Sequence, residues 1–330
     1  MVICKPPIRP KNRHLQSFLA SARLRLRRLK EGNPVIEKQQ EVMLDTPDAR
    51  LQGFYTPGNT DQLSILLHGW EGSAESTYIQ LLANTLHEQG HAIFRLNFRD
   101  HGATHHLNKD LFHSCRLQEV VDAIAAAQRQ HPYQHNNLIG FSLGGNFALR
   151  VASKADSANI RLQRVFSVSP PINPKNSMIA ISASSIYSRY FLNKWKRSLQ
   201  IKADLYPQLF TNTAWQPENS LESLTRMLIL QLTEYDTTDD YFAGYSITPE
   251  IISTISTPTH IITAWDDPVI PFDDFNSIDR LSQVQIKASP HGGHCGFIQG
   301  WSMRSWVEDY IIEETQHANI GRTESIAEIG

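Results

Sequence analysis

The residues of this chain that are best suited to chemistry are a serine, an aspartate and a histidine, spaced far apart in that order. Ser142 is the centre of the G-x-S-x-G pentapeptide Gly140–Gly144, a motif expected by chance only about 0.06 times in a chain of this composition. A strand-like segment precedes it and a helix-like segment follows it, which is the context of a nucleophile elbow. The pattern predicts that Ser142 is a nucleophile; the alternative is a glycine-rich turn with a capping serine.

A serine nucleophile needs a base, and the base needs an acid that orients it. His294 stands among glycines between an expected strand and an expected helix, which leaves its ring free to turn toward Ser142. We therefore predict that His294 is the base, with His291 as the alternative. Two carboxylates compete for the orienting role at the end of another strand. Asp267 directly precedes a Pro-Val-Ile-Pro turn and is the predicted orienting acid, with Asp266 as the alternative.

When a serine of this kind attacks a carbonyl group, backbone N–H groups must bind the oxyanion that forms. A His-Gly-Trp sequence follows an expected strand, and Gly69 permits an unusual backbone there. We expect the N–H groups of Trp70 and Leu143 to form this oxyanion hole. His68 is interpreted as a residue that braces the loop by hydrogen bonds, and Arg99–His101 as residues that organise a second loop at the edge of the site.

Two other histidine patterns are interpreted as structural. His87 and His91 match HExxH, but Gly90 is expected to end the helix before His91, so we expect no zinc site. His105 and Asp110 match an HxxxxD pattern of acyltransferases, but the pattern lies in mid-chain rather than at a recognised acyl-acceptor site. We expect neither a metal nor a cofactor.

The elements that position these residues alternate between strand and helix, which predicts an α/β fold with a mostly parallel central sheet flanked by helices. The expected strands are Glu41–Thr46, Arg50–Tyr55, Leu63–Leu67, Ala92–Phe98, Asn137–Phe141, Arg164–Val168, Thr259–Ala264 and Val284–Ala288. The expected helices are Thr77–Gln89, Leu117–Gln130, Leu143–Ser153 and Ile298–Ile312.

Interruptions of this alternation divide the chain into five segments. We expect a basic N-terminal helical segment (1–40), the first part of the core (41–172), a mainly helical cap insertion (173–256), the second part of the core (257–314) and a loose polar tail (315–330).

The composition is that of an ordinary globular protein, with 41% hydrophobic and 19% charged residues and a net charge of −2. Residues 1–30 hold nine of the 31 basic residues and none of the 33 acidic ones, so the remaining chain has 22 basic and 33 acidic residues, a net of −11. Such an acidic body excludes a general nucleic-acid binder. Three widely spaced cysteines favour a reducing compartment. We expect no signal peptide and no membrane-spanning helix, and hence a cytoplasmic location.

Residues 15–30 have the pattern of a basic amphipathic helix. Its expected apolar face consists of Leu15, Phe18, Leu19, Ala22, Leu26 and Leu29. Such a helix either packs this face on the domain or lies weakly on an anionic membrane, here the inner surface of a cell membrane.

Taken in order, the motifs HGWEGS, RLNFRDHGATHHLN, LFHS, GFSLGGN, WDDP and HGGHCGF resemble the YheT-type branch of the α/β-hydrolases. That branch includes bacterial YheT hydrolases, plant embryogenesis-associated proteins and animal α/β-hydrolase-domain lipases. The upstream Asn12–Gln16 is similar too, so the resemblance covers roughly residues 10–312.

The resemblance implies an α/β-hydrolase fold, with Ser142 as nucleophile, Asp267 as charge-relay acid and His294 as base. It also implies cofactor-free hydrolysis of a small-molecule or lipid carboxylic ester through an acyl-enzyme. The alternative functions are an acyltransferase with the same triad and a non-catalytic binding protein on a hydrolase scaffold.

Overall fold

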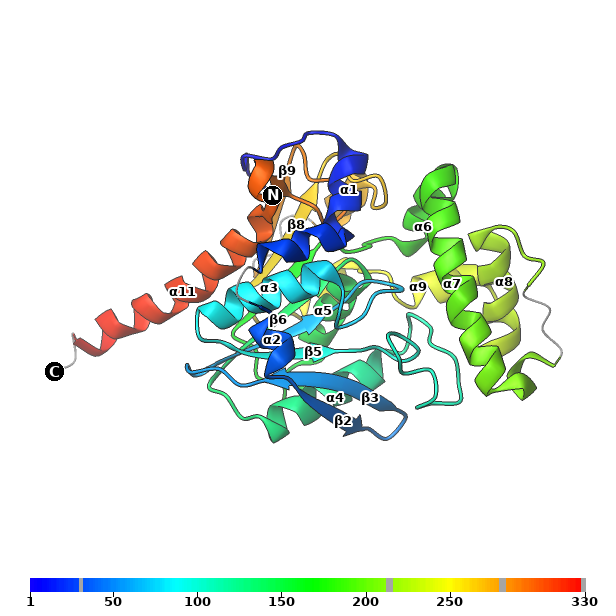
Figure 1. Cartoon of the computed structure of the whole chain (residues 1–330), viewed down its shortest axis with the longest axis horizontal. Helices are drawn as coiled ribbons and strands as arrows, with labels where there is room; N and C mark the ends of the chain where they lie inside the picture. The colour runs from blue at the N-terminus through cyan, green and yellow to red at the C-terminus, as the bar shows by residue number, and fades with distance from the viewer. Residues whose placement is uncertain (30–31, 212–215, 279–282, 328–330) are drawn as a thin grey trace.

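The computed structural model describes residues 1–29, 32–211, 216–278 and 283–327, and its centre is a nine-stranded sheet with helices on both faces (Figure 1). The strand order is β1-β9-β8-β7-β6-β4-β5-β3-β2. β2 pairs with β3, and β3 with β5, in antiparallel fashion, whereas the other pairs are parallel. The predicted fold class is therefore confirmed, and β1 adds an edge strand that the sequence pattern did not indicate.

The strands of this sheet are β1 (Val2–Ile3), β2 (Gln40–Asp45), β3 (Arg50–Thr56), β4 (Gln62–Leu67), β5 (Ala92–Leu96), β6 (His135–Phe141), β7 (Arg164–Val168), β8 (Thr259–Ala264) and β9 (Val284–Ser289). A separate hairpin consists of β10 (Ile298–Gln299) and β11 (Arg304–Ser305).

The α-helices are α1 (Arg13–Ser21), α2 (Pro34–Glu37), α3 (Thr77–Glu88), α4 (Leu117–Gln130), α5 (Leu143–Lys154), α6 (Pro174–Ala183), α7 (Ser185–Leu205), α8 (Leu221–Leu232), α9 (Thr238–Ala243), α10 (Pro249–Ser253) and α11 (Trp306–Ala327). Short 3₁₀ helices are η1 (Arg23–Arg28), η2 (Pro207–Phe210), η3 (Phe272–Ser277) and η4 (Gly300–Ser302). None of the helices in the described ranges is long and apolar enough to cross a membrane.

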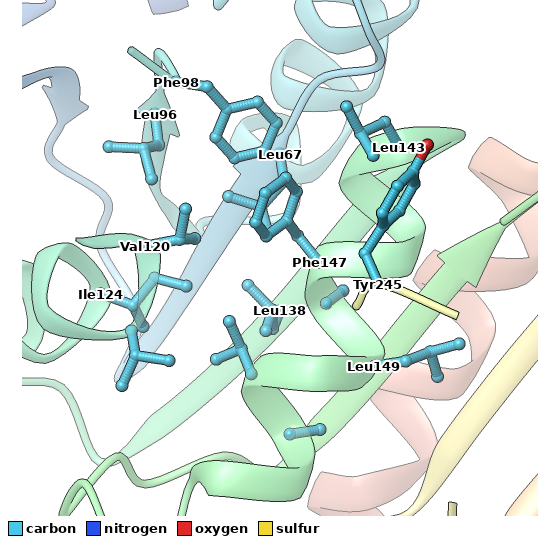
Figure 2. Packing of buried hydrophobic residues seen from close by; sticks show 14 of the residues in the cluster. Leu67, Leu96, Phe98, Val120, Ile124, Leu138, Leu143, Phe147, Leu149 and Tyr245 are labelled. Carbon is cyan, nitrogen blue, oxygen red and sulfur yellow. The ribbon is translucent and has the colours of Figure 1, made fainter. Parts of the chain in front are cut away.

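The central strand β4 is buried on both faces, and its side chains alternate between two cores. Leu67 belongs to the core that contains side chains of α4 and α5, whereas Leu66 belongs to the core that contains side chains of α3. In the first core the rings of Phe98 and Phe147 lie 4.8 Å apart, next to Leu67 (Figure 2). These contacts fix the ends of the strands from which the site loops leave.

The prediction of a helix over Ile298–Ile312 is wrong in its first half. Ile298–Ser305 forms the β10–β11 hairpin, and the helix begins only at Trp306. The reason is a tight reversal in which Gly300 has φ +55° and Met303 has φ +53°, values that no α-helix tolerates. The helix then runs to Ala327, so most of the segment that we expected to be a loose tail is helical; residues 328–330 lie outside the described residues.

The predicted helix over residues 15–30 is also corrected. It consists of two pieces, α1 and η1, separated at Ala22, and Lys30 lies outside the described residues. The face expected to be buried is buried only in part. Leu15 and Phe18 are 45% and 46% exposed, whereas Leu19, Ala22, Leu26 and Leu29 are half-buried.

The buried side of this N-terminal segment is mainly polar. Gln16 is fully buried, and it donates to the carbonyl oxygen of Ile298 and accepts from the N–H of the same residue. Arg25, 1% exposed, donates to Glu308 of α11 at 3.0 Å. The segment therefore docks on the domain mainly through hydrogen bonds and an ion pair, with Ala20 as its buried apolar residue.

The predicted cap, residues 173–256, lies between β7 and β8 and contains α6, α7, α8, α9 and α10; residues 212–215 are outside the described part. In Figure 1, α6, α7 and α8 stand to one side of the sheet. We call residues 173–256 the cap below.

Candidate active site

Ser142 occupies a strained turn between β6 and α5. Its backbone has φ 54° and ψ −121°, a conformation that residues other than glycine rarely adopt. Two glycines make room for the turn. A Cβ on Gly140 would lie 2.0 Å from the carbonyl oxygen of Gly144, and a Cβ on Gly144 would lie 2.4 Å from that of Leu67. The chain can therefore follow this path only with glycine at both positions.

The three side chains predicted from the sequence are hydrogen-bonded in series. His294 Nε2 lies 3.0 Å from Ser142 Oγ, and His294 Nδ1 lies 2.9 Å from Asp267 Oδ2. The Asp267 side chain is fully buried, and its other oxygen accepts the N–H groups of Val269 and Ile270 at 2.8 and 3.0 Å. Because the carboxylate can only accept, a neutral His294 donates its Nδ1 proton to Asp267 and offers the Nε2 lone pair to Ser142.

The environment of His294 favours its protonated form. Burial acts to lower the pKa of His294, but Asp267 and Cys295 raise it more, so that the pKa lies well above the ordinary value. The imidazolium is the form that a base takes after it accepts a proton. The arrangement can therefore hold a proton on His294 next to the Ser142 hydroxyl.

The two alternatives raised by the sequence, Asp266 and His291, are paired with each other. His291 Nδ1 lies 3.3 Å from one oxygen of Asp266, and the other oxygen accepts the N–H of Gly293 at 2.9 Å. Asp266 thus holds the loop that carries His294.

Helix α1 holds the same loop from the other side. The N–H of His294 donates to Ser17 Oγ at 2.8 Å. A Cβ on Gly293, whose φ is +55°, would lie 2.3 Å from the carbonyl oxygen of Arg13, so the loop and the helix are in close contact. Our sequence reasoning missed Ser17, because an isolated serine in an amphipathic pattern carries no sign of a partner 277 positions away.

The predicted oxyanion-hole residues flank Ser142. Leu143 is the first residue of α5, so its N–H has no acceptor within the helix. Trp70 follows Gly69, where a Cβ would lie 3.1 Å from the Cβ of Ser142. His68 braces this loop, as expected, because its Nε2 accepts the N–H of Phe98 at 3.2 Å.

Ser142 lies where two hollows meet. One is a cavity of about 120 Å³ beneath the cap, lined mainly by apolar side chains such as Met178, Phe191 and Leu228. The other is a larger and more polar groove of about 1030 Å³ that also contains His294. Its walls include residues of α1, η1 and α7, so the cap and the N-terminal segment both border the site.

Glu71, directly after Trp70, borders both hollows. Burial raises the pKa of its carboxyl group to about 7, against the effect of the nearby Lys194 ammonium and together with Asp100. The Glu71 carbonyl oxygen accepts a hydrogen bond from Lys194 Nζ at 3.0 Å. Neither Glu71 nor Lys194 was singled out from the sequence.

The other patterns have structural partners. His91 Nδ1 lies 2.9 Å from Ser64 Oγ of β4, and His105 Nε2 lies 2.8 Å from Ser198 Oγ of α7. Arg99 forms a buried ion pair with Glu119 at 2.7 Å, consistent with the expected role in its loop. Within the described ranges, no group of three or more His, Cys, Asp or Glu side chains is arranged to hold a metal ion.

Comparison with known proteins gives the family of this chain. Residues 65–300, more than half of the chain, match the family model described as alpha/beta hydrolase fold. The chain is 25% identical over 254 residues to the Escherichia coli (strain K12) protein named "Putative esterase YheT", covering 75% of this chain and 74% of that protein. It is 19% identical over 285 residues to "Phospholipase ABHD3" of Mus musculus, covering 85% and 69%.

Among solved structures, the esterase Pf2001 of Pyrococcus furiosus superposes with a TM-score of 0.57 at 14% identity, covering 84% of this chain and 90% of that one. A structure of Est1E from Butyrivibrio proteoclasticus, with ferulic acid bound, superposes with a TM-score of 0.55 at 15% identity, covering 84% and 98%. At these identities the likeness shows a shared fold.

Proposed function

This chain belongs to the α/β-hydrolase family, in its YheT-type branch, and on that basis we propose that it is a serine hydrolase that cleaves carboxylic esters. The observation that carries the proposal is the series of hydrogen bonds from Ser142 through His294 to Asp267, at 3.0 and 2.9 Å. The relatives' names, an esterase and a phospholipase, also denote ester cleavage.

In the proposed reaction, Ser142 Oγ attacks the ester carbonyl carbon while His294 Nε2 takes the hydroxyl proton. Asp267 keeps the required tautomer of His294 and stabilises the imidazolium. The N–H groups of Trp70 and Leu143 bind the oxyanion. The tetrahedral intermediate collapses as His294 gives its proton to the leaving alcohol, which produces an acyl-enzyme. His294 then removes a proton from water, whose attack releases the acid and restores Ser142.

The two hollows suggest where the acyl and alcohol parts of an ester lie when its carbonyl group is at Ser142. The apolar cavity beneath the cap suits an acyl group, because burying apolar surface there removes it from water at about 25 cal/mol per Å². The polar groove, open to solvent, suits the alcohol part, which leaves first. We therefore propose that the substrate is an ester of an apolar, lipid-like acyl group.

The test is hydrolysis of p-nitrophenyl esters of increasing acyl length, alongside a monoacylglycerol and a phospholipid. Ser142→Ala should abolish both hydrolysis and labelling by a fluorophosphonate without lowering the unfolding temperature. His294→Ala should lower turnover comparably, by about 10⁴–10⁶. His291→Ala is the matched control and should retain most of the activity.

Turnover by Ser142→Ala close to that of the unchanged protein would refute the proposal. A product ester formed faster than the free acid when alcohols are added would assign an acyltransferase instead. Absence of both labelling and turnover in the unchanged, folded protein would favour a binding protein.

A further inference from the structure

A residue of the cap contacts the loop that carries a proposed oxyanion donor. Lys194 of α7 donates a hydrogen bond to the carbonyl oxygen of Glu71 at 3.0 Å. Glu71 has φ 54°, a left-handed conformation that is unfavourable for a side chain of this kind and persists only where neighbouring groups enforce it. The preceding residue is Trp70, whose N–H is the proposed donor. Lys194 therefore stabilises a strained backbone next to the group that must point at the oxyanion.

The side chain of Trp70 is held by the same stretch of α7. Its ring stacks on Phe191, with centroids 5.3 Å apart and planes 13° apart. The ring of Trp195 meets it edge-on at 5.2 Å. Phe191 and Trp195 are one helical turn apart and lie on either side of Lys194 in the sequence, so one patch of α7 fixes both the Trp70 ring and the following carbonyl group. Backbone rotation at Trp70 would break these contacts.

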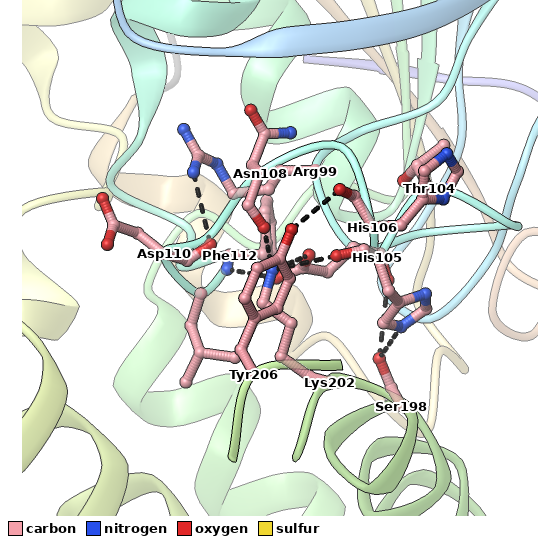
Figure 3. A network of polar contacts seen from close by, with 12 residues as sticks. Arg99, Thr104, His105, His106, Asn108, Asp110, Phe112, Ser198, Lys202 and Tyr206 are labelled. Atoms are coloured by element: carbon pink, nitrogen blue, oxygen red, sulfur yellow. Dashed lines mark hydrogen bonds and ion pairs between the residues drawn. The ribbon is translucent and has the colours of Figure 1, made fainter. Parts of the chain in front are cut away.

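Farther along, α7 is anchored to the loop after β5 by a row of polar residues at four-residue spacing. Lys202, 1% exposed at its side chain, pairs with Asp100 at 2.7 Å and also donates to the carbonyl oxygens of His105 and Asn108 (Figure 3). Separating this pair would leave each buried charge without its oppositely charged partner. Ser198 bonds to His105 at 2.8 Å, one turn earlier. Lys194 is one turn earlier again, so its position is set by an anchored helix.

From these contacts we propose that Lys194 is a positioning residue for the oxyanion hole, and that the hole is complete only while α7 is seated on the core. The proposal rests on the function proposed above. Lys194 acts through Glu71, by holding its carbonyl group and so restraining the turn that carries the Trp70 N–H. The cap thus contributes to stabilisation of the transition state as well as to the wall of the acyl cavity.

The test compares Lys194→Met, which keeps the length of the side chain and removes the donor, with Lys194→Arg, which keeps a donor. Loss of a whole oxyanion donor lowers kcat by about 10²–10³. If the donor is present but points less accurately at the oxyanion, kcat should fall by about 10- to 100-fold. We expect this fall in kcat for Lys194→Met, with KM changed less than about twofold. For Lys194→Arg we expect kcat to lie within a few-fold of that of the unchanged protein.

A second readout separates oxyanion binding from other roles. A trifluoromethyl ketone forms a tetrahedral oxyanion on Ser142, whereas the carboxylic acid product does not. For Lys194→Met, the inhibition constant of the ketone should rise by the same factor by which kcat falls, and that of the acid should stay unchanged. Lys196→Met is the matched control: Lys196 is on the same helix, but bonds the carbonyl oxygen of Gln216 in an exposed position.

Each other outcome overturns the inference. A higher KM with unchanged kcat would make Lys194 a substrate-binding residue. Equal losses in Lys196→Met, or a lower unfolding temperature with full kcat per active site, would leave only an anchoring role. Active sites are counted by end-point titration with a fluorophosphonate. If Lys194→Met does not fold, the test is repeated with Lys194→Gln, whose side chain is too short to reach Glu71. Failure here leaves the esterase proposal intact, whereas an active Ser142→Ala refutes the proposed function itself.

Discussion

Replacing Asp267 by asparagine changes the chemistry of the site with little change in shape. One oxygen of Asp267 accepts the N–H groups of Val269 and Ile270 at 2.8 and 3.0 Å, and the other faces His294 Nδ1 at 2.9 Å. An asparagine that keeps its oxygen on the two N–H groups turns its NH₂ toward His294. The Nδ1 atom must then accept, so the ring proton moves to Nε2, which can no longer take a proton from Ser142.

The size of the effect follows from the opposite orientation of the amide. Turning the asparagine oxygen toward His294 restores the tautomer, but the NH₂ group then faces the buried N–H groups of Val269 and Ile270. Each of these loses its acceptor, which costs about 1–3 kcal/mol. The productive orientation is then disfavoured by about 2–6 kcal/mol, or roughly 30- to 10⁴-fold. Loss of the negative charge beside the imidazolium adds to this, so we expect Asp267→Asn to lower turnover by roughly 10⁴.

The assay is kcat for a p-nitrophenyl ester, expressed per titrated active site, together with the unfolding temperature, which should change little. Asp266→Asn is the control. Its amide can still accept the N–H of Gly293 and donate to His291, so it should lower turnover by about tenfold or less. A loss smaller than about 30-fold in Asp267→Asn, or a larger loss in Asp266→Asn, would refute this reasoning.

Three further results are expected. Asp267 and Cys295 raise the pKa of His294 by more than burial lowers it. Because the base must be neutral to accept a proton, kcat/KM should rise with pH through a midpoint above 6.5. A midpoint below 6.5 would contradict this. The added Cβ of Gly144→Ala would lie 2.4 Å from a backbone carbonyl oxygen, so this variant should lower the free energy of unfolding by about 1–3 kcal/mol or more and slow fluorophosphonate labelling. The added Cβ of Gly145→Ala would lie 2.9 Å from a hydroxyl oxygen, so its effects should be smaller. Urea titrations and labelling assays measure both. Anionic vesicles should bind the protein weakly at low salt, and replacing three exposed arginines of the N-terminal segment, Arg13, Arg23 and Arg27, by Gln should abolish that binding; co-sedimentation that survives high salt or the replacement would contradict an electrostatic attachment.

The sequence was sufficient to predict which three side chains the structure brings together, because their signals are local. The pentapeptide around Ser142 is dictated by clashes between residues only a few positions apart. Asp267 and His294 follow strands β8 and β9, and Trp70 follows β4. Because parallel strands end at the same edge of a sheet, residues directly after them are brought together by the topology.

The residues that support this site could not be predicted in the same way, because their partners are distant in sequence. The apolar periodicity of residues 15–30 indicated a buried face, but Gln16 and Arg25 are buried instead. Their partners are backbone groups near Ile298 and the carboxylate of Glu308, which no local pattern reveals. Lys194 belongs to a row of polar residues on a cap helix, a signal that also fits a solvated face.

The docking of α1 and η1 has a consequence for the biosynthesis of the protein. Arg25 emerges from the ribosome early, but its partner Glu308 follows 283 positions later. At about 5–20 residues per second, that interval is on the order of tens of seconds. During this time the guanidinium group of Arg25 stays hydrated, and Ser17 has no His294 loop to brace. The hydrogen bond from His294 to Ser17 and the ion pair of Arg25 with Glu308 can therefore form only long after α1 has been synthesised, so the candidate site is assembled across the whole of this interval.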